Sequence, residues 1–276
     1  MVKLGAHLSI SGGYAKALKN IKKIGGNCLQ IFSISPRGWT FAKVNEKNSN
    51  QFIHLKSKLK IDPVFFHTSY LINLADTGRI GQLSKQFIKH ELNIASQYGI
   101  KGTIIHLGSY KHEALSVKHE TLIGNIKEIL CGSPQETLFI IENAGNKKIG
   151  QNLKEIAKII KEVNNQRVRV CLDTCHLYSA GYDLSTPEKI EQFIKVFDSL
   201  IGLEKLELFH FNDSKDPFHS GRDRHENIGQ GNIPVNEFKL IMTHLKLKHL
   251  PFIIETPGFN NEGPDKKNLD VLKSLL

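Results

Sequence analysis

The chain lacks any apolar run that approaches the roughly 20 residues needed to span a membrane. Its first residues, MVKLGAHLS, have the composition of a strand rather than of an export signal. Cysteine is scarce, and the spacing of Cys28, Cys131, Cys171 and Cys175 is not that of a zinc-binding cluster. These features predict a soluble, cytoplasmic protein without a membrane partner. We expect its cysteines to form no disulfides and to be buried as small apolar side chains.

The chain also lacks low-complexity segments and an obvious linker, so residues 1–276 are expected to form a single domain. Hydrophobic residues make up 40% of the sequence, which is enough for a large core. The formal net charge of +10 permits a polyanionic partner such as nucleic acid. Lysines that merely cover helix surfaces would give the same excess, so the charge alone does not identify a partner.

Short apolar runs alternate with longer amphipathic stretches along the whole chain. Runs with the length and composition of strands occur at 3–9, 28–32, 63–67, 103–107, 138–142, 168–173, 206–211 and 252–256. Helical patterns between them include 14–24, 83–97, 115–130, 153–163, 187–201 and 235–247. Nearly continuous apolar strands that alternate with helices predict a parallel sheet, and eight such units predict a closed (β/α)8 TIM barrel. An open doubly wound sheet is the alternative, but the first strand is not followed by a glycine-rich fingerprint.

The segment from Leu206 to Gly231 carries the most informative residues. Its apolar run ends on His210, and the loop that follows contains Asp223 and His225. Residues two apart on an extended segment point the same way, so Asp223 and His225 can converge on one ion. Imidazole and carboxylate are the usual zinc ligands of a site kept open for chemistry. Taken alone, the segment could equally contain a hydrogen-bonded core histidine and a solvated charge cluster.

Residues of the same kind stand at or near the ends of other predicted strands. Together with His210 they are His67, His106, Glu142, Asp173, His176 and Glu255. In a parallel barrel these strand ends share one rim, where catalytic groups are built. Each residue could singly be a hydrogen-bonded polar group. Seven on one rim, joined by Asp223 and His225 from a loop on the same side, predict a site for several metal ions.

Nine ligands are too many for one zinc ion and suit three ions if one carboxylate bridges two of them. Three divalent cations with one hydroxide outweigh the charge of Glu142, Asp173, Asp223 and Glu255, so the site should remain slightly positive. Such a site favours a phosphodiester, whose negative charge rises during attack. Zinc lowers the pKa of bound water to about 7, so no Ser or Cys nucleophile is needed, and phosphoryl transfer is the expected chemistry.

Two motifs, CLDTCHLYSAGYD at 171–183 and HFNDSKDPFHSGRDRHENIGQG at 210–231, closely resemble those of endonuclease IV, the metal-dependent family of apurinic/apyrimidinic (AP) endonucleases. GAHLSISGG near the N-terminus, HTSYLINL at 67–74, HLGS at 106–109 and IET at 254–256 are similar to the same family in the same order. The resemblance implies a TIM barrel, three zinc ions (manganese could replace one) and cleavage of double-stranded DNA 5′ to an abasic site, leaving a 3′-hydroxyl. It also implies trimming of 3′ ends, and we expect a monomer.

Matched by position, the family's metal ligands fall into three groups in this chain. The groups are His67, His106 and Glu142; Glu142, Asp173, His210 and Glu255; and His176, Asp223 and His225. Glu142 would bridge the first two ions and set their spacing. Glu255 would also help to orient the attacking hydroxide, so these two carboxylates are the predicted catalytic residues. His7, at the end of the first strand, is expected beside the site without an assigned metal.

The resemblance also concerns DNA, because family members insert side chains into the duplex at positions that match Arg37, Tyr70 and Leu71. Such side chains can fill the gap left by an extruded abasic nucleotide and offset the lost stacking. Ordinary loop packing is the alternative for Tyr70 and Leu71. The chain departs from the family at Leu107, where Pro is usual, and in ENAGNKKIG at 142–150, which leaves the shape of that loop open.

Two other functions stay open from the sequence. A divalent-metal sugar isomerase or epimerase of the same barrel type would explain the group around Asp173 and His210, but not the group around His176. A non-catalytic, basic DNA-binding protein would use its metals structurally. Structural zinc sites are usually closed by four protein ligands and rich in cysteine. The ligands predicted here include no cysteine, which favours catalysis.

Overall fold

The computed structural model describes residues 2–41, 43–110, 115–146 and 148–276. Its main sheet is a closed parallel barrel in the order β1-β10-β7-β6-β5-β4-β3-β2. The strands are β1 (Lys3–Leu8), β2 (Cys28–Phe32), β3 (Val64–His67), β4 (Gly102–Ile105), β5 (Leu138–Glu142), β6 (Val168–Asp173), β7 (Leu206–His210) and β10 (Pro251–Ile254). Each overlaps one predicted run, and the predicted TIM barrel is confirmed.

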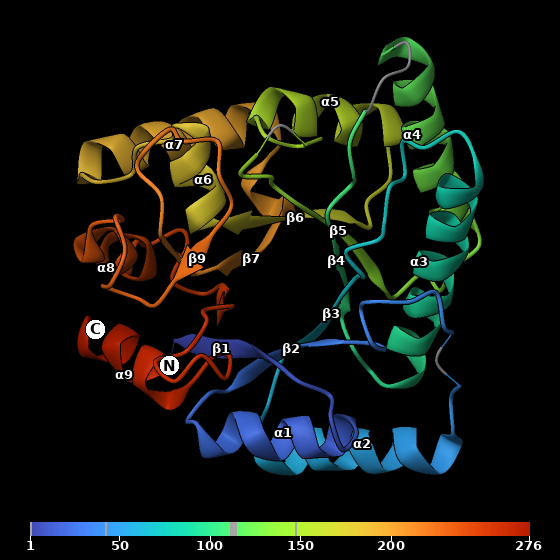
Figure 1. Ribbon diagram of the computed structural model, residues 1–276, viewed down its shortest axis with the longest axis horizontal. Helices are drawn as coiled ribbons and strands as arrows, with labels where there is room; N and C mark the ends of the chain where they lie inside the picture. Colours follow the sequence, from blue (N-terminus) through green and yellow to red (C-terminus); the bar gives the residue numbers. More distant parts are fainter. Residues whose placement is uncertain (1, 42, 111–114, 147) are drawn as a thin grey trace.

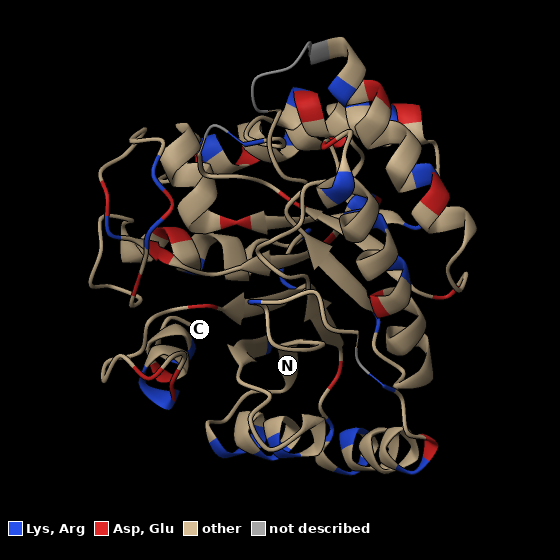
Figure 2. Ribbon diagram, turned by 45° about the vertical axis from the view of Figure 1, so that its right-hand side comes forward, with Lys and Arg blue, Asp and Glu red and all other residues tan. Residues whose placement is uncertain are grey.

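Helices surround the barrel (Figure 1). They are α1 (Tyr14–Lys23), α2 (Glu46–Leu59), α3 (Arg79–Gln97), α4 (Leu115–Cys131), α5 (Leu153–Val163), α7 (Pro187–Leu200), α8 (Val235–Thr243) and α9 (Lys266–Ser274), with the short helix α6 (Thr174–Ala180) directly after β6. Lys and Arg lie mainly on these helices and in the loops (Figure 2). Within the described ranges, no helix is long and apolar enough to cross a membrane.

Some element boundaries differ from the sequence prediction. Helix α3 begins four residues earlier than the predicted 83, after a turn in which Asp76 Oδ1 accepts hydrogen bonds from the backbone of Gly78 and Gly81. Helix α8 ends at Thr243 rather than at 247. Leu247 lies in a turn after the helix but is still buried. Its apolar side chain therefore fits the helical spacing of the sequence, which predicted a longer helix.

The prediction that all four cysteines are buried is wrong for one of them. Cys28, Cys171 and Cys175 are buried, whereas Cys131 is exposed. Cys131 is the last residue of α4 and follows Leu130, which is buried. Successive residues of an α-helix are rotated by about 100° around its axis, so the residue after a buried one can face solvent.

The barrel interior is filled by an apolar layer with one residue from each of seven strands. The layer consists of Cys28, Phe65, Ile104, Ile140, Cys171, Leu208 and Ile253. At the matching position of β1 stands Gly5, where an added Cβ would come 2.2 Å from the backbone oxygen of Cys28. The interior is therefore closed below the carboxyl ends of the strands, and a larger core packs between the barrel and its helices.

Candidate metal centre

A ring of polar side chains lies directly above the apolar layer. Side chains two apart on a strand point to the same face, so the residue two positions after each of the seven layer members, and after Gly5, also faces the barrel interior. These residues are His7, Gln30, His67, His106, Glu142, Asp173, His210 and Glu255. Six of them are predicted metal ligands. Gln30 and His7 had no assigned ligand role, although the same two-residue step locates both.

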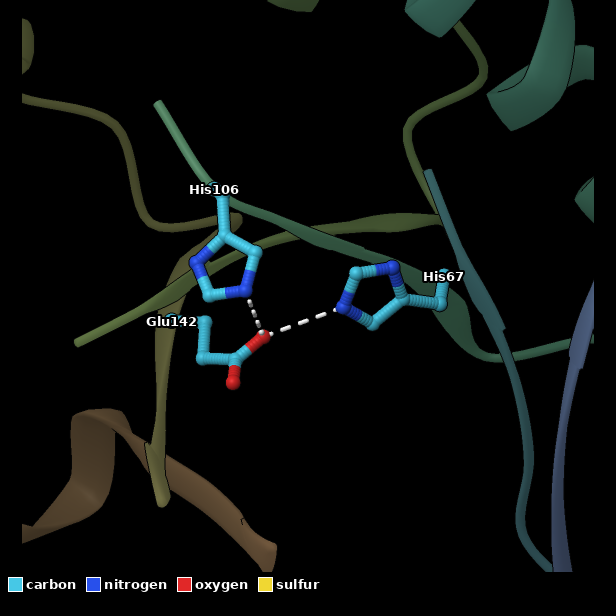
Figure 3. A group of neighbouring side chains, drawn as sticks. All are labelled: His67, His106 and Glu142. Atoms are coloured by element: carbon cyan, nitrogen blue, oxygen red, sulfur yellow. Dashed lines mark hydrogen bonds and ion pairs between the residues drawn. The ribbon is translucent and has the colours of Figure 1, made fainter. Parts of the chain in front are cut away.

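The first predicted group meets on one carboxylate oxygen. His67 Nε2 lies 3.0 Å and His106 Nε2 lies 3.2 Å from Glu142 Oε2 (Figure 3). His67 Nδ1 lies 2.8 Å from the backbone oxygen of Thr68, to which it donates, so Nε2 is the nitrogen that faces the group. Figure 3 shows both rings pointing toward Glu142 from neighbouring strands.

The second predicted group meets on the other oxygen of Glu142. His210 Nδ1 lies 3.1 Å from Glu142 Oε1, and His176 Nδ1, which belongs to the third group, lies 3.3 Å from the same oxygen. Ligand atoms of Glu142, Asp173, His210 and Glu255 all lie within 4.8 Å of one another. The two oxygens of one buried carboxylate thus face two different groups, which is the arrangement a bridging ligand requires.

The third predicted group is completed by the loop after β7. His176 Nε2 and His225 Nε2 lie 3.0 Å and 3.4 Å from Asp223 Oδ1. Strand β9 (His225–Glu226) pairs antiparallel with β8 (Asp213–Ser214), which holds this segment extended. Between the two inward residues, Arg224 points the other way and donates from Nε to Asp216 at 2.7 Å. Alternation on an extended segment therefore brings Asp223 and His225 to the same side.

Two asparagines that the sequence interpretation missed support these groups. Asn212 donates from Nδ2 to Asp173 Oδ2 at 2.6 Å, and its Oδ1 accepts from the backbone of Glu255 at 2.7 Å. Asn143 accepts from the backbone of Asp173 at 2.7 Å, and its own backbone oxygen accepts from His176 Nδ1 at 2.8 Å. Asn143 directly follows Glu142, and Asn212 is two residues after His210. This closeness to predicted ligands in the sequence is the signal that could have identified both.

Opposite charges dominate the electrostatics of the centre. Burial alone would raise the pKa of Glu142, but nearby imidazoles hold it well below its ordinary value. Burial alone would lower the pKa of His176, yet Asp173 and Asp223 outweigh it and raise that pKa well above the ordinary value. His106 differs, because burial prevails there and lowers its pKa to about 4. Glu142, Asp223 and Glu255, whose pKa values are all lowered, are thus ionised at neutral pH, and His176 carries a proton that a metal must displace.

The donor set fits divalent metal ions. Nε2 of His176 and Nε2 of His225 are buried and lie close to Asp223 Oδ1, yet neither makes a hydrogen bond of normal geometry in the part of the chain that is described. Buried polar atoms are normally satisfied, so such nitrogens call for another partner. Imidazole nitrogens and carboxylate oxygens are zinc ligands, and all three predicted groups have ligand atoms within 4.8 Å of one another. Cys175 also comes within this range of Asp173 and His225.

A cleft of about 850 Å³ opens over the centre, and its lining includes Arg37 and Tyr70 together with His67, His106, His176, Asp223, His225 and Glu255. Tyr70 is 72% exposed and Leu71 is 39% exposed, and the Tyr70 ring lies edge-on to Phe32. Arg37 is also exposed. The three predicted DNA-contacting residues are therefore accessible from solvent, and two of them line the same cleft as the predicted ligands.

The two departures from the family pattern lie close to the centre without removing a ligand. Leu107 is fully buried, and its backbone oxygen accepts from the backbone of Leu74. In the 142–150 loop, Lys147 lies outside the described residues, while Lys148 lines the cleft. The loop returns to the barrel at Gly150, whose backbone oxygen accepts from the backbone of Ala144.

Comparisons with known proteins agree with this architecture. A family model described as a xylose isomerase-like TIM barrel matches residues 18–275. "Probable endonuclease 4" of Thermosipho melanesiensis is 38% identical over 267 residues, which cover 94% of each chain. The crystal structure of endonuclease IV from Thermus thermophilus superposes with a TM-score of 0.87 at 29% identity, covering 99% of this chain and 98% of that one. A D-tagatose 3-epimerase-like protein, at 17% identity and a TM-score of 0.74 over 99% and 96% of the two chains, shares the fold.

Replacing Asp223 by Ala should lower the metal content by one ion per chain, because His176 and His225 then lose their common carboxylate partner. The barrel should stay folded, since Asp223 comes from a loop outside it. Metal analysis of the purified variant, with circular dichroism as the folding control, measures both. Unchanged metal content would remove Asp223 from the ligand set.

Metal binding should release protons at neutral pH. Burial lowers the pKa of His176 and His210, but neighbouring carboxylates help to raise both well above the ordinary value, so these two rings hold protons in the metal-free protein. A ligating nitrogen must be deprotonated, so metal affinity should rise with pH and fall with acidification. Calorimetric titration in buffers of different ionisation enthalpy counts the protons. A binding heat that is the same in every buffer would contradict this assignment.

Proposed function

The chain belongs to the endonuclease IV family, and on that basis we propose that it cleaves double-stranded DNA on the 5′ side of abasic sites, leaving a 3′-hydroxyl. As a family member it is a DNA-repair nuclease. The observation that most supports the proposed reaction is the meeting of three ligand groups on the floor of one open cleft, two of them joined through Glu142. Trimming of 3′ ends would use the same site.

Three zinc ions fit the proposed centre, one for each ligand group, and manganese could replace one of them. When bound, such ions polarise phosphate oxygens and lower the pKa of water. The protein's own contribution is to fix the spacing of the groups. Glu142 does so between the first two groups, since its buried carboxylate faces both. Asp173 is held by Asn212 and by the backbone of His176, which also fixes the start of α6.

Glu255 is the second proposed catalytic carboxylate. Its Oε1 accepts hydrogen bonds from His7 Nδ1 at 2.8 Å and from Gln30 Nε2 at 2.5 Å. Its Oε2 lies 3.5 Å from His210 Nδ1 and so points toward the second group. Glu255 also lines the cleft, whereas Glu142 lies below it and is fully buried. This position suits a carboxylate that both holds an ion and orients the attacking water.

Recognition of the damaged strand is assigned to the mouth of the cleft. An exposed ring at Tyr70, with Leu71 beside it, can fill the space that an extruded abasic nucleotide leaves in the stack. Arg37 lines the same cleft and can contact the DNA backbone or the gap. The net charge of +10 supports affinity for the duplex as a whole. We propose that the enzyme works as a monomeric, single-domain protein in the cytoplasm.

A sugar isomerase or epimerase explains less of the centre. The second group alone would suffice for a single divalent ion, and proteins with epimerase activity in their names share this fold. The third group, around His176 and Asp223, would then have no use. A non-catalytic DNA-binding role likewise leaves the open cleft above the ligands unexplained.

The deciding experiment combines a metal count with a nicking assay on a duplex that contains one abasic site. We expect a single incision 5′ to that site, a 3′-hydroxyl end that a polymerase can extend, and loss of incision after chelation. An intact duplex of the same sequence is the control. If the metal-loaded protein left the abasic duplex intact but interconverted ketoses, the nuclease function would be refuted and the epimerase function supported.

The variant Tyr70→Ala should weaken binding to abasic duplex by about 1–3 kcal/mol, the scale of one lost stacking contact. Binding to intact duplex rests on Lys and Arg contacts to phosphate and should hardly change. Titrations of both duplexes at the same salt concentration measure the difference. Equal losses on the two DNAs would mean that Tyr70 supports the fold of its loop rather than the gap in the stack.

The variant Glu255→Gln should slow incision by several powers of ten, because orientation of the attacking water matters chiefly in the transition state. His7 and Gln30 both donate to Oε1, so the new amide will place its carbonyl there and its NH2 toward His210. Affinity for abasic DNA should stay within about tenfold, since the phosphate contacts are untouched. Metal content is measured in parallel. A variant that keeps its metals and cuts at the wild-type rate would exclude Glu255 and leave Glu142 as the catalytic carboxylate.

A further inference from the structure

We propose that Gln30 is a positioning residue whose buried amide holds His210 and Glu255 in the orientation in which they bind a divalent cation. The proposal rests on the metal-binding part of the proposed function and goes beyond its ligand set. Gln30 lies on β2, has no exposed surface and occupies the polar ring above Cys28. Its neighbours in the ring, His7 on β1 and His67 on β3, lie on the two strands that pair with β2.

The amide of Gln30 contacts two predicted ligands at once. Its Oε1 lies 2.7 Å from His210 Nε2, and its Nε2 lies 2.5 Å from Glu255 Oε1. His210 and Glu255 come from adjacent strands on the far side of β1, so one side chain connects the first part of the barrel to the last. Both partners belong to the second ligand group.

Only one orientation of this amide satisfies both contacts. An ionised carboxylate can only accept hydrogen bonds, so the NH2 group must face Glu255. The carbonyl then faces His210 and requires a proton on Nε2 of that ring. In the neutral ring, this leaves the lone pair on Nδ1, which lies 3.1 Å from Glu142 Oε1 and 3.5 Å from Glu255 Oε2. Gln30 therefore selects the ring nitrogen that faces the second group.

Gln30 also determines which oxygen of Glu255 is free. Oε1 is engaged by Gln30 and by His7 Nδ1, which lies 2.8 Å away. Oε2 remains for the second group. Rotation of the carboxylate would give up both hydrogen bonds. Hydrogen bonds from surrounding residues commonly orient metal ligands in this way.

The chemistry of the position explains why an amide suits it. A carboxylate at this place would repel Glu255, and an ammonium group would repel a bound cation. Glutamine is neutral, carries a donor and an acceptor on one planar group, and is long enough to span the two ligands. It can therefore orient both without changing the charge of the centre.

The variant Gln30→Met tests this role, because Met is close to Gln in size and retains neither hydrogen bond. When zinc-loaded protein is titrated with a chelator, one ion per chain should be released at a chelator concentration about 10–100-fold lower than in wild type. Loss of an orienting partner usually weakens metal binding by this factor. The remaining zinc should follow the wild-type curve. Incision of abasic duplex should be slow at limiting zinc and recover with excess zinc, which loss of fold would not allow.

Thr103→Val is the matched control. Thr103 is a fully buried barrel residue outside the predicted ligand set, and its hydroxyl donates to Glu91 Oε2 at 2.5 Å. It should lower Tm with and without zinc by similar amounts and leave the chelator titration unchanged. In Gln30→Met, by contrast, the gap between the two Tm values should narrow, because weaker binding stabilises the folded state less.

A second variant covers the case in which Gln30→Met does not fold. Gln30→Asn retains the amide but is one methylene shorter, so it cannot reach both partners, and the same early release of one ion is expected. Zinc release within twofold of wild type in a folded variant overturns the proposal. The chelator titration needs no DNA, so a protein that binds zinc but does not cut would refute the proposed nuclease and leave this test intact.

Discussion

The centre depends on one buried carboxylate that is surrounded by imidazoles. Glu142 has no exposed surface, and its two oxygens face different pairs of rings, His67 with His106 and His210 with His176. A carboxylate buried without such partners would be strongly disfavoured in its charged form. Here the imidazoles keep it ionised, and its position between them fixes how far apart the first two ligand groups can be.

The barrel supplies the geometry that makes this arrangement stable. An apolar layer that includes Phe65 and Ile140 fills the interior, and the next inward position on every strand is polar. Over two residues of each strand, the inward-facing side chains therefore change from the apolar core to the polar residues of the centre. Because the polar side chains rest on packed neighbours and on strands rather than loops, they can be held close together despite the cost of burying them.

Much of this could be predicted from the sequence, because strands and rim residues follow simple periodicities. The eight apolar runs gave the barrel, and the position of His67, Asp173 or His210 at the end of a run placed it on the rim. Helices such as α2 were not predicted, since α2 buries only Ser49 and Phe52 and so has little apolar periodicity. Gln30 and Asn212 were missed for a different reason: an amide has no metal preference of its own, and its role appears only when its two partners are seen in space.

The hydrogen bond between His7 and Glu255 joins the first barrel strand to the residue that follows the last one, 248 positions apart in the chain. A chain that stops before β10 lacks Glu255, so its second ligand group is incomplete however well the earlier strands are formed. During synthesis the full metal centre can therefore assemble only after nearly the whole polypeptide has been made. A nascent or truncated form would therefore lack part of the predicted ligand set until the barrel is closed.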